Sequence, residues 1–230
     1  MTTTDLVCQS DEFIFVKKYD RALQCLEEFR ANNSTDAMVL LGDMYFNGNG
    51  VEIDFNKAKE NYEQVNELND SNGAVRIGNM CYYGKGVEDY LKVKEYYESA
   101  IRFKNTNDNA YHNLADLYLN RYGVNKDTTK AKEYLELSTQ YGNKVAPLKL
   151  GSMYLNGNGV PQDYSKAKEY YEIALRRDNP NSYSKLGFLY STGKGVEIDA
   201  IKAKEFFEVG ASKNDSESIH NLANLYFVGF

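Results

Sequence analysis

The chain has 230 residues, a formal net charge of −6, 42% hydrophobic residues and 26% charged residues. This balance is that of a folded globular protein and excludes a disordered chain, and the length suffices for a sizeable core. The acidic net charge argues against a nucleic-acid partner, because phosphate binding requires a basic surface. Only 3 Pro interrupt the chain, so long stretches are free to be helical.

The three cysteines, Cys8, Cys25 and Cys81, have wide spacing that fits neither a disulfide framework nor a metal-ligand series. We expect reduced, partly buried thiols. The amino terminus lacks a basic segment followed by an apolar one, so no signal peptide is predicted. No apolar run is long enough to cross a membrane. The expected location is therefore cytoplasmic, with no membrane insertion.

A unit of about 36 residues repeats along the chain. Three copies, LGDMYFNGNGVEIDFNKAKENY, LGSMYLNGNGVPQDYSKAKEYY and LGFLYSTGKGVEIDAIKAKEFF, begin at Leu41, Leu150 and Leu186. Weaker copies begin at Ile77 and Leu114, and a partial one, LANLYFVGF, ends the chain. A small residue follows the leading Leu or Ile in every copy, at intervals of 36, 37, 36, 36 and 36 residues: Gly42, Gly78, Ala115, Gly151, Gly187 and Ala223. We call this residue the anchor. Such self-similarity predicts an all-α solenoid of stacked repeats.

Residues 1–34 are predicted to be degenerate capping helices. In YDRALQCLEEF, Ala22 lies 36 residues before Ala58, and Arg21 takes the register of Lys57. The glycines and the capping Asp of the repeat are missing, as is typical of a terminal unit. Residues 35–230 would then hold five full repeats and the first helix of a sixth.

Each repeat is predicted to begin with a helix that contains the anchor. In the first copy, Ala37, Leu41, Met44 and Tyr45 recur at offsets of three and four, which define one helical stripe. Gly inside a helix costs about 1 kcal/mol relative to Ala. A recurring Gly or Ala at the anchor therefore indicates a place where a second helix crosses closely.

A glycine turn is predicted to end this first helix, because glycine tolerates the positive φ of a helix C-terminus. The glycine pairs are Gly48/Gly50, Gly84/Gly86, Gly157/Gly159 and Gly193/Gly195. Arg121 replaces the first glycine in the third repeat, so we expect a different turn there. A Gly-x-Gly pair also occurs in phosphate-binding loops, but those follow a strand, whereas these follow a helix.

The second helix of each repeat is predicted to begin after an acidic residue that caps it: Asp54, Asp89, Asp127, Asp163 and Asp199. Five acids in register could suggest metal or acid–base chemistry, but they belong to different repeats, which favours capping. The aromatic residues that follow, such as Tyr62, Tyr97, Tyr171 and Phe207, are expected to form the core. The last, unpaired first helix would leave its stripe of Leu222, Leu225 and Tyr226 partly uncovered.

These residues together give the pattern A-x-x-x-L-G-x-x-Y-x-x-G-x-G-V-x-x-D-x-x-K-A, which resembles the Sel-one-like repeat, a relative of the tetratricopeptide repeat. The resemblance covers residues from about 35 to the end. It implies a right-handed α/α superhelical solenoid whose first helices line a concave surface. It also implies a scaffold or adaptor that binds a protein or peptide there, with no cofactor.

Candidate partner-binding residues lie on the predicted first helices, and their positions are counted from the anchor. Position −2 holds Leu40 and then five consecutive basic or amide residues, a stripe able to hold a peptide backbone or a carboxylate. A simply exposed, polar position is the alternative. With the neighbouring positions −3 and +1, the candidate set is Arg76, Asn79, His112, Asn113, Asp116, Lys149, Lys185, Asn221 and Asn224.

Two other functions are alternatives to a scaffold: an enzyme of the β-lactam-binding type and a self-associating structural protein. One branch of the family carries a cysteine pair in every repeat and has been linked to β-lactam binding or hydrolysis. This chain lacks those pairs and has no S-x-x-K motif with a matching K-T-G element, so no enzyme is expected. No Ser–His–Asp or metal-binding arrangement is predicted either. The other function is self-association through the uncovered last helix, and the oligomeric state stays open.

Overall fold

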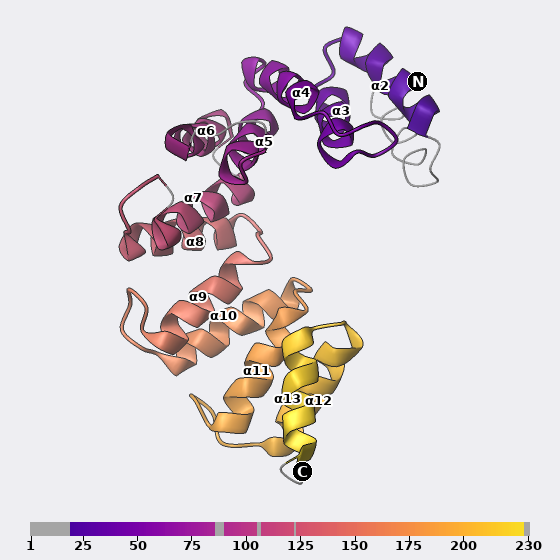
Figure 1. Cartoon of the computed structure of the whole chain (residues 1–230). Helices are drawn as coiled ribbons and strands as arrows, with labels where there is room; N and C mark the ends of the chain where they lie inside the picture. Colours follow the sequence, from indigo (N-terminus) through magenta and orange to yellow (C-terminus); the bar gives the residue numbers. More distant parts are fainter. Residues whose placement is uncertain (1–18, 86–89, 105–106, 122, 228–230) are drawn as a thin grey trace. The chain divides into compact units, whose positions relative to one another are not determined.

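The computed structural model describes residues 19–85, 90–104, 107–121 and 123–227. Every regular element within these ranges is an α-helix (Figure 1), which confirms the predicted all-α repeat fold. The helices are α2 Tyr19–Ala31, α3 Thr35–Asn47, α4 Phe55–Glu67, α5 Ser71–Tyr82, α6 Tyr90–Phe103, α7 Asp108–Asn120, α8 Thr128–Gln140, α9 Ala146–Asn156, α10 Tyr164–Arg176, α11 Asn181–Thr192, α12 Ala200–Ser212 and α13 Ser216–Phe227. Cys8, Gly86 and Asp89 lie outside the described residues.

The chain divides into two compact units, residues 1–125 and residues 126–230. The first unit contains α2 to α7, and the second contains α8 to α13. The boundary falls inside the third repeat, between its first helix, α7, and its second helix, α8. Within each unit, consecutive helices pack against one another as hairpins joined by short turns (Figure 1).

An aromatic ring from the second helix covers the glycine anchor of the first helix. A Cβ atom built on Gly42, Gly78, Gly151 or Gly187 would lie 2.6 to 2.8 Å from the Cδ1 atom of the covering ring, which belongs to Tyr62, Tyr97, Tyr171 and Phe207 respectively. No real Cβ atom approaches that closely. The close crossing of a second helix, which the recurring Gly or Ala predicted, is thus confirmed at these four anchors, and the covering ring leaves no room there for a Cβ atom.

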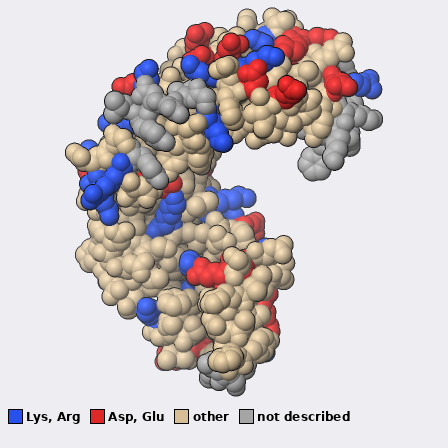
Figure 2. Space-filling view, viewed as in Figure 1, with Lys and Arg blue, Asp and Glu red and all other residues tan. Residues whose placement is uncertain are grey.

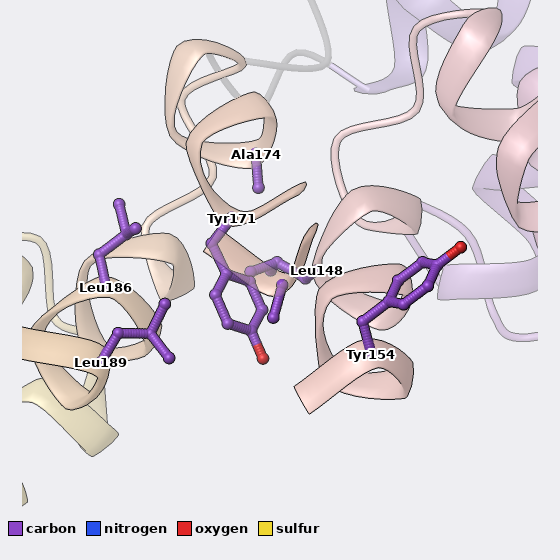
Figure 3. Close-up of a cluster of buried hydrophobic side chains, with 7 residues drawn as sticks. Leu148, Tyr154, Tyr171, Ala174, Leu186 and Leu189 are labelled. Atoms are coloured by element: carbon purple, nitrogen blue, oxygen red, sulfur yellow. The ribbon is translucent and has the colours of Figure 1, made fainter. Parts of the chain in front are cut away.

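The core of the second unit is built around one of these rings. Tyr171 of α10 is fully buried and lies between Leu148 of α9 and Leu189 of α11 (Figure 3). It thereby joins the first helices of two successive repeats. The neighbouring Tyr170 stacks on Tyr154, with ring centroids 5.6 Å apart and an interplanar angle of 9°.

The predicted caps are present at four of the second helices. Asp54, Asp127, Asp163 and Asp199 each precede the first helical residue, and their carboxylates accept backbone N–H bonds from the first turn. These bonds satisfy donors that the helix itself leaves unpaired. The acidic residues in register are thus explained by capping.

A second turn, between repeats, also has left-handed backbone and was not predicted. Asn33, Asn69, Asp178 and Asn214 have φ between 55° and 62°, and each follows a second helix. Asn and Asp tolerate this region better than other non-glycine residues, because their short polar side chains bond locally.

The prediction of a different turn at Arg121 is wrong. Arg121 itself adopts the left-handed conformation, with φ 64°, and its backbone N–H bonds to the carbonyl oxygen of Leu117. Gly48, Gly157 and Gly193 end their helices with the same geometry, at φ 68° to 71°. The helix C-terminus dictates the conformation, and the third repeat adopts it with a residue that has a Cβ atom.

The Arg121→Gly variant is therefore expected to be more stable than the wild type. A left-handed non-glycine residue costs about 1 kcal/mol, and glycine removes most of that cost. The measurement is the urea midpoint of unfolding, with Arg121→Ala as the control that keeps the Cβ atom. An equal midpoint for wild type and Arg121→Gly would show that the turn is unstrained.

Candidate partner-binding face

The surface formed by positions −2, +1 and +4 of the first helices is called the first-helix face here. At position +1, three repeats place a polar side chain that bonds to the tyrosine covering the anchor. The Tyr62 hydroxyl donates to Asp43 at 2.6 Å, and the Tyr97 hydroxyl donates to Asn79 at 2.8 Å. The hydroxyls of Tyr171 and Ser152 lie 3.2 Å apart. The fifth repeat has Phe at both positions, Phe188 and Phe207.

Position −2 of the next repeat adds a second bond to the same +1 residue. The Arg76 guanidinium donates to the Asp43 carboxylate at 2.7 Å, across 33 residues of chain. The Asn113 amide donates to Asn79 Oδ1 at 2.8 Å, across 34 residues. We call the set Asp43, Tyr62, Arg76, Asn79, Tyr97 and Asn113 the polar ladder. It consists of two groups of three, Asp43–Tyr62–Arg76 and Asn79–Tyr97–Asn113, and each group joins a second helix and two successive first helices.

The remaining candidates lie on several helices. Lys185 of α11 bonds to Glu217 of α13 at 2.6 Å. His112 Nε2 lies 3.6 Å from the Asp116 carboxylate on α7. Lys149 on α9 and Asn221 on α13 are half-buried, and the exposed Asn224 lies 3.0 Å from His220.

The structure therefore brings three candidates together, Arg76, Asn79 and Asn113, all in the first unit. Arg76, Asn113 and Lys185 of the −2 stripe also form bonds between repeats. Sequence reasoning did not anticipate this role. The sequence does contain a signal for these bonds: a polar residue at +1 is followed about 33 residues later by a polar residue that can donate a hydrogen bond to it.

Burial changes the acidity of the ladder tyrosines. It raises the pKa of Tyr62 well above its ordinary range, and the adjacent Asp43 carboxylate raises it further. Burial also raises the pKa of Tyr97 well above that range. Both hydroxyls therefore stay protonated in the folded protein and act as hydrogen-bond donors to the first helices.

This gives an expected pH dependence. Tyrosines of the unfolded chain ionise near pH 10, whereas Tyr62 and Tyr97 stay protonated in the folded state. Unfolding then releases protons, so stability is retained below pH 10 and falls as the pH rises towards the folded pKa values, by about 1 kcal/mol per pH unit for each residue. Urea unfolding from pH 9 to 11.5 should show a shallower fall for the Tyr62→Phe/Tyr97→Phe variant. If the unfolding free energy falls equally steeply with pH in the variant and the wild type, the two tyrosines do not cause the pH dependence.

A hollow of about 180 Å³ opens on the first-helix face between α3 and α5. Its lining combines apolar and polar side chains: Asp43, Phe46, Asn47, Tyr62, Arg76, Asn79, Met80 and Tyr83. Tyr83 is 64% exposed and stands at the C-terminus of α5. The hollow therefore contains two of the predicted partner-binding residues, Arg76 and Asn79, next to aromatic side chains that the prediction did not name.

Three further features bear on function: possible metal ligands, possible membrane-spanning helices and the exposed stripe of α13. Among the described residues, no three His, Cys, Asp or Glu side chains converge as metal binding requires. No helix within the same ranges has the length and apolar character needed to cross a membrane. On α13, Leu225 is buried, Leu222 is partly buried and Tyr226 is 53% exposed.

The repeats match a known family. The Sel1 repeat pattern matches residues 35–70, 71–102, 108–142, 146–179 and 180–215. The chain belongs to the Sel1 repeat family. No protein in the curated comparison set matches it significantly.

Solved structures agree with this family. A Sel1 repeat protein from Oxalobacter formigenes has a TM-score of 0.86 and 25% identity, over 96% of this chain and 89% of that protein. A protective antigen of uropathogenic Escherichia coli strains, with an SLR fold, has a TM-score of 0.76 and 25% identity, over 92% of this chain and 45% of that one. An immunity protein from Pseudomonas aeruginosa, 19% identical with a TM-score of 0.62 over 91% of this chain and 84% of that one, shares the fold.

Sel1 repeats commonly serve as protein-interaction modules, and proteins built from them are typically not enzymes. The charge distribution of this Sel1 repeat protein fits that class. On the face of the first unit visible in Figure 2, acidic and basic side chains are mixed, with no continuous basic surface of the kind that nucleic-acid binding requires.

Proposed function

We propose that this protein is a non-enzymatic scaffold or adaptor that binds a peptide or a partner surface along its first-helix face. The hollow between α3 and α5 carries the proposal. Binding sites are usually concave and combine apolar and aromatic side chains with polar groups that fix orientation, and the lining of this hollow has both kinds. Within the first unit, the close packing of Tyr62 over Gly42 and of Tyr97 over Gly78 holds α3 against α4 and α5 against α6.

The proposal includes a cytoplasmic location and a binding surface that extends over the predicted set. Cys25 is a free thiol, which suits a reducing compartment. Within the set, Arg76, Asn79 and Asn113 are central, because they lie at the hollow or bond to a residue that lines it. In the second unit, the half-buried Lys149, Lys185 and Asn221 are proposed to contact a partner as well.

Residues 1–34 are proposed to cap the repeats of residues 35–230. In support, α2 takes the place of a second helix: Ala22 and Leu26 are fully buried, at the registers of Ala58 and Tyr62. Tyr19, the first residue of α2, packs directly over Gly50 in the turn of the first repeat. Tyr164 packs over Gly195 in the same way, between two ordinary repeats.

Site-specific photo-crosslinking tests the binding surface. A photo-reactive phenylalanine analogue would replace the exposed Tyr83 at the rim of the hollow, and in a control protein it would replace the exposed Glu60 on the second helix α4. After incubation with a lysate of the native host, we expect discrete crosslinked products from position 83 and none of these from position 60. The same products from both positions, or from position 60 only, would refute a partner surface on the first-helix face.

A further inference from the structure

The lining of the hollow between α3 and α5 includes Asn79, the residue at position +1 of the second repeat. In the fifth repeat, the residue at the register of Asn79 is Phe188, whose ring packs against the core cluster of the second unit. In the second repeat, the shorter Asn79 turns its Oδ1 atom to Tyr97 and Asn113 instead. Two aromatic side chains, Phe46 and Tyr83, line the hollow together with Asn79.

The electrostatics of the hollow select the kind of group that can enter. Its two charged residues are Asp43 and Arg76, which neutralise each other at 2.7 Å. The Asp43 carboxylate also accepts the Tyr62 hydroxyl. A charged side chain that entered the hollow would lose its hydration and would find no unpaired opposite charge there, which is costly. An uncharged guest suffers no such penalty.

The volume and the lining of the hollow further restrict which side chain of a partner can bind. A cavity of about 150 Å³ with apolar walls accepts a benzene ring, so about 180 Å³ accommodates one large side chain. Phe46, Met80 and Tyr83 provide apolar and aromatic contact, which favours an aromatic or a large aliphatic group. The amides of Asn47 and Asn79 at the hollow can bond to a peptide backbone.

We infer that the hollow lined by Phe46, Arg76, Asn79, Met80 and Tyr83 is an anchor pocket for one large uncharged side chain, Phe, Tyr, Leu or Met, of an extended partner peptide. This inference rests on the proposed function and adds the chemistry of the residue that is recognised. Neighbouring peptide residues would lie along α3 and α5, so the anchor residue fixes the register of the peptide.

A pair of variants taken from the chain itself tests the inference. Asn79→Phe/Tyr97→Phe reproduces the combination of Phe188 and Phe207 in the fifth repeat with Asn221 in the helix that follows it, because Asn113 takes the register of Asn221. This change fills the pocket with a combination of residues that the fold already uses. Asn79→Ala/Tyr97→Phe loses the same polar bonds but leaves the pocket open, so it is the matched control. Circular dichroism melting checks that both variants are folded.

A display library of random nine-residue peptides is selected on the full chain, and Kd values of the enriched peptides are measured. We expect the enriched peptides to share one Phe, Tyr, Leu or Met. Their Kd should rise about tenfold or more in the filled variant, since one large apolar side chain loses its burial, and change only a few-fold in the open control. Replacement of the shared residue by Glu or Lys should weaken binding to a similar extent.

Three outcomes would overturn the inference: a shared charged residue, equal binding to the filled variant, or no enriched peptide at all. The two proposals can fail separately. If the partner that crosslinks at position 83 binds the filled variant as well as the wild type, the anchor pocket is refuted and the first-helix surface stands. If no partner crosslinks at position 83, the proposed function fails, whatever the library gives.

Discussion

Replacing Tyr171 by alanine is expected to lower the free energy of unfolding by about 4 kcal/mol. A large buried aromatic side chain removed from a core costs about 3 to 5 kcal/mol, because burial is lost and a cavity remains. The cost should fall in the upper part of that range. The ring covers Gly151 and contacts both neighbouring first helices, so no single helix can move in to close the space. Urea unfolding followed by circular dichroism measures the change.

Tyr171→Phe is the control for the ring alone. It loses only the contact of the hydroxyl with Ser152 at 3.2 Å, and the fifth repeat already uses Phe207 at this register. A cost of about 1 kcal/mol or less is expected. If Tyr171→Ala costs no more than Tyr171→Phe, the ring over the anchor does not hold the repeat together.

Replacing Gly73 by alanine is expected to destabilise the protein by about 2 kcal/mol. On helix propensity alone, this change inside α5 would stabilise by about 1 kcal/mol. A Cβ atom at Gly73, however, would collide with the backbone nitrogen of Asn66, and would lie 2.6 Å from the carbonyl oxygen of Tyr62. Backbone atoms cannot rotate away, so α4 and α5 would have to separate, and such overpacking costs about 1 to 3 kcal/mol or more.

The sign of the change makes this a sharp test. Ala110 stands at the same register in the third repeat, and Ala110→Gly should also destabilise, by about 1 kcal/mol, through helix propensity and lost packing. Opposite substitutions at equivalent positions would then both lower the urea midpoint. A higher midpoint for Gly73→Ala would show that α4 and α5 have room for a methyl group.

Local features of the fold were predictable because each leaves a mark in most of the repeats. Gly42 and its counterparts, the capping Asp54 and the turn glycine Gly48 each follow from one backbone requirement. Gly73 left no such mark, since the other repeats have Ala or Ser at its register. The close approach of α4 and α5 is a property of one helix pair and becomes visible only in three dimensions.

The site was predictable only in part. Periodicity placed Arg76 and Asn79 on the first-helix face, and the structure puts both at the hollow. Periodicity could not pair Arg76 with Asp43, because that bond depends on how one repeat stacks on the next. Nor could it reveal the hollow, because the lining side chains come from three helices, α3, α4 and α5, whose packing sets the space between them. The volume of the hollow depends on several side chains at once and cannot be inferred from any single residue.

The polar ladder also bears on how such an array can evolve. Asp43 is matched to Arg76 in the following repeat, and Asn79 is matched to Asn113 in the one after that. A duplicated or transposed repeat would bring a +1 residue opposite a −2 residue that does not complement it, leaving a half-buried carboxylate or amide without its partner. Such a rearrangement is expected to destabilise the protein at these two junctions. The polar pairs thus favour one order for the repeats that they connect.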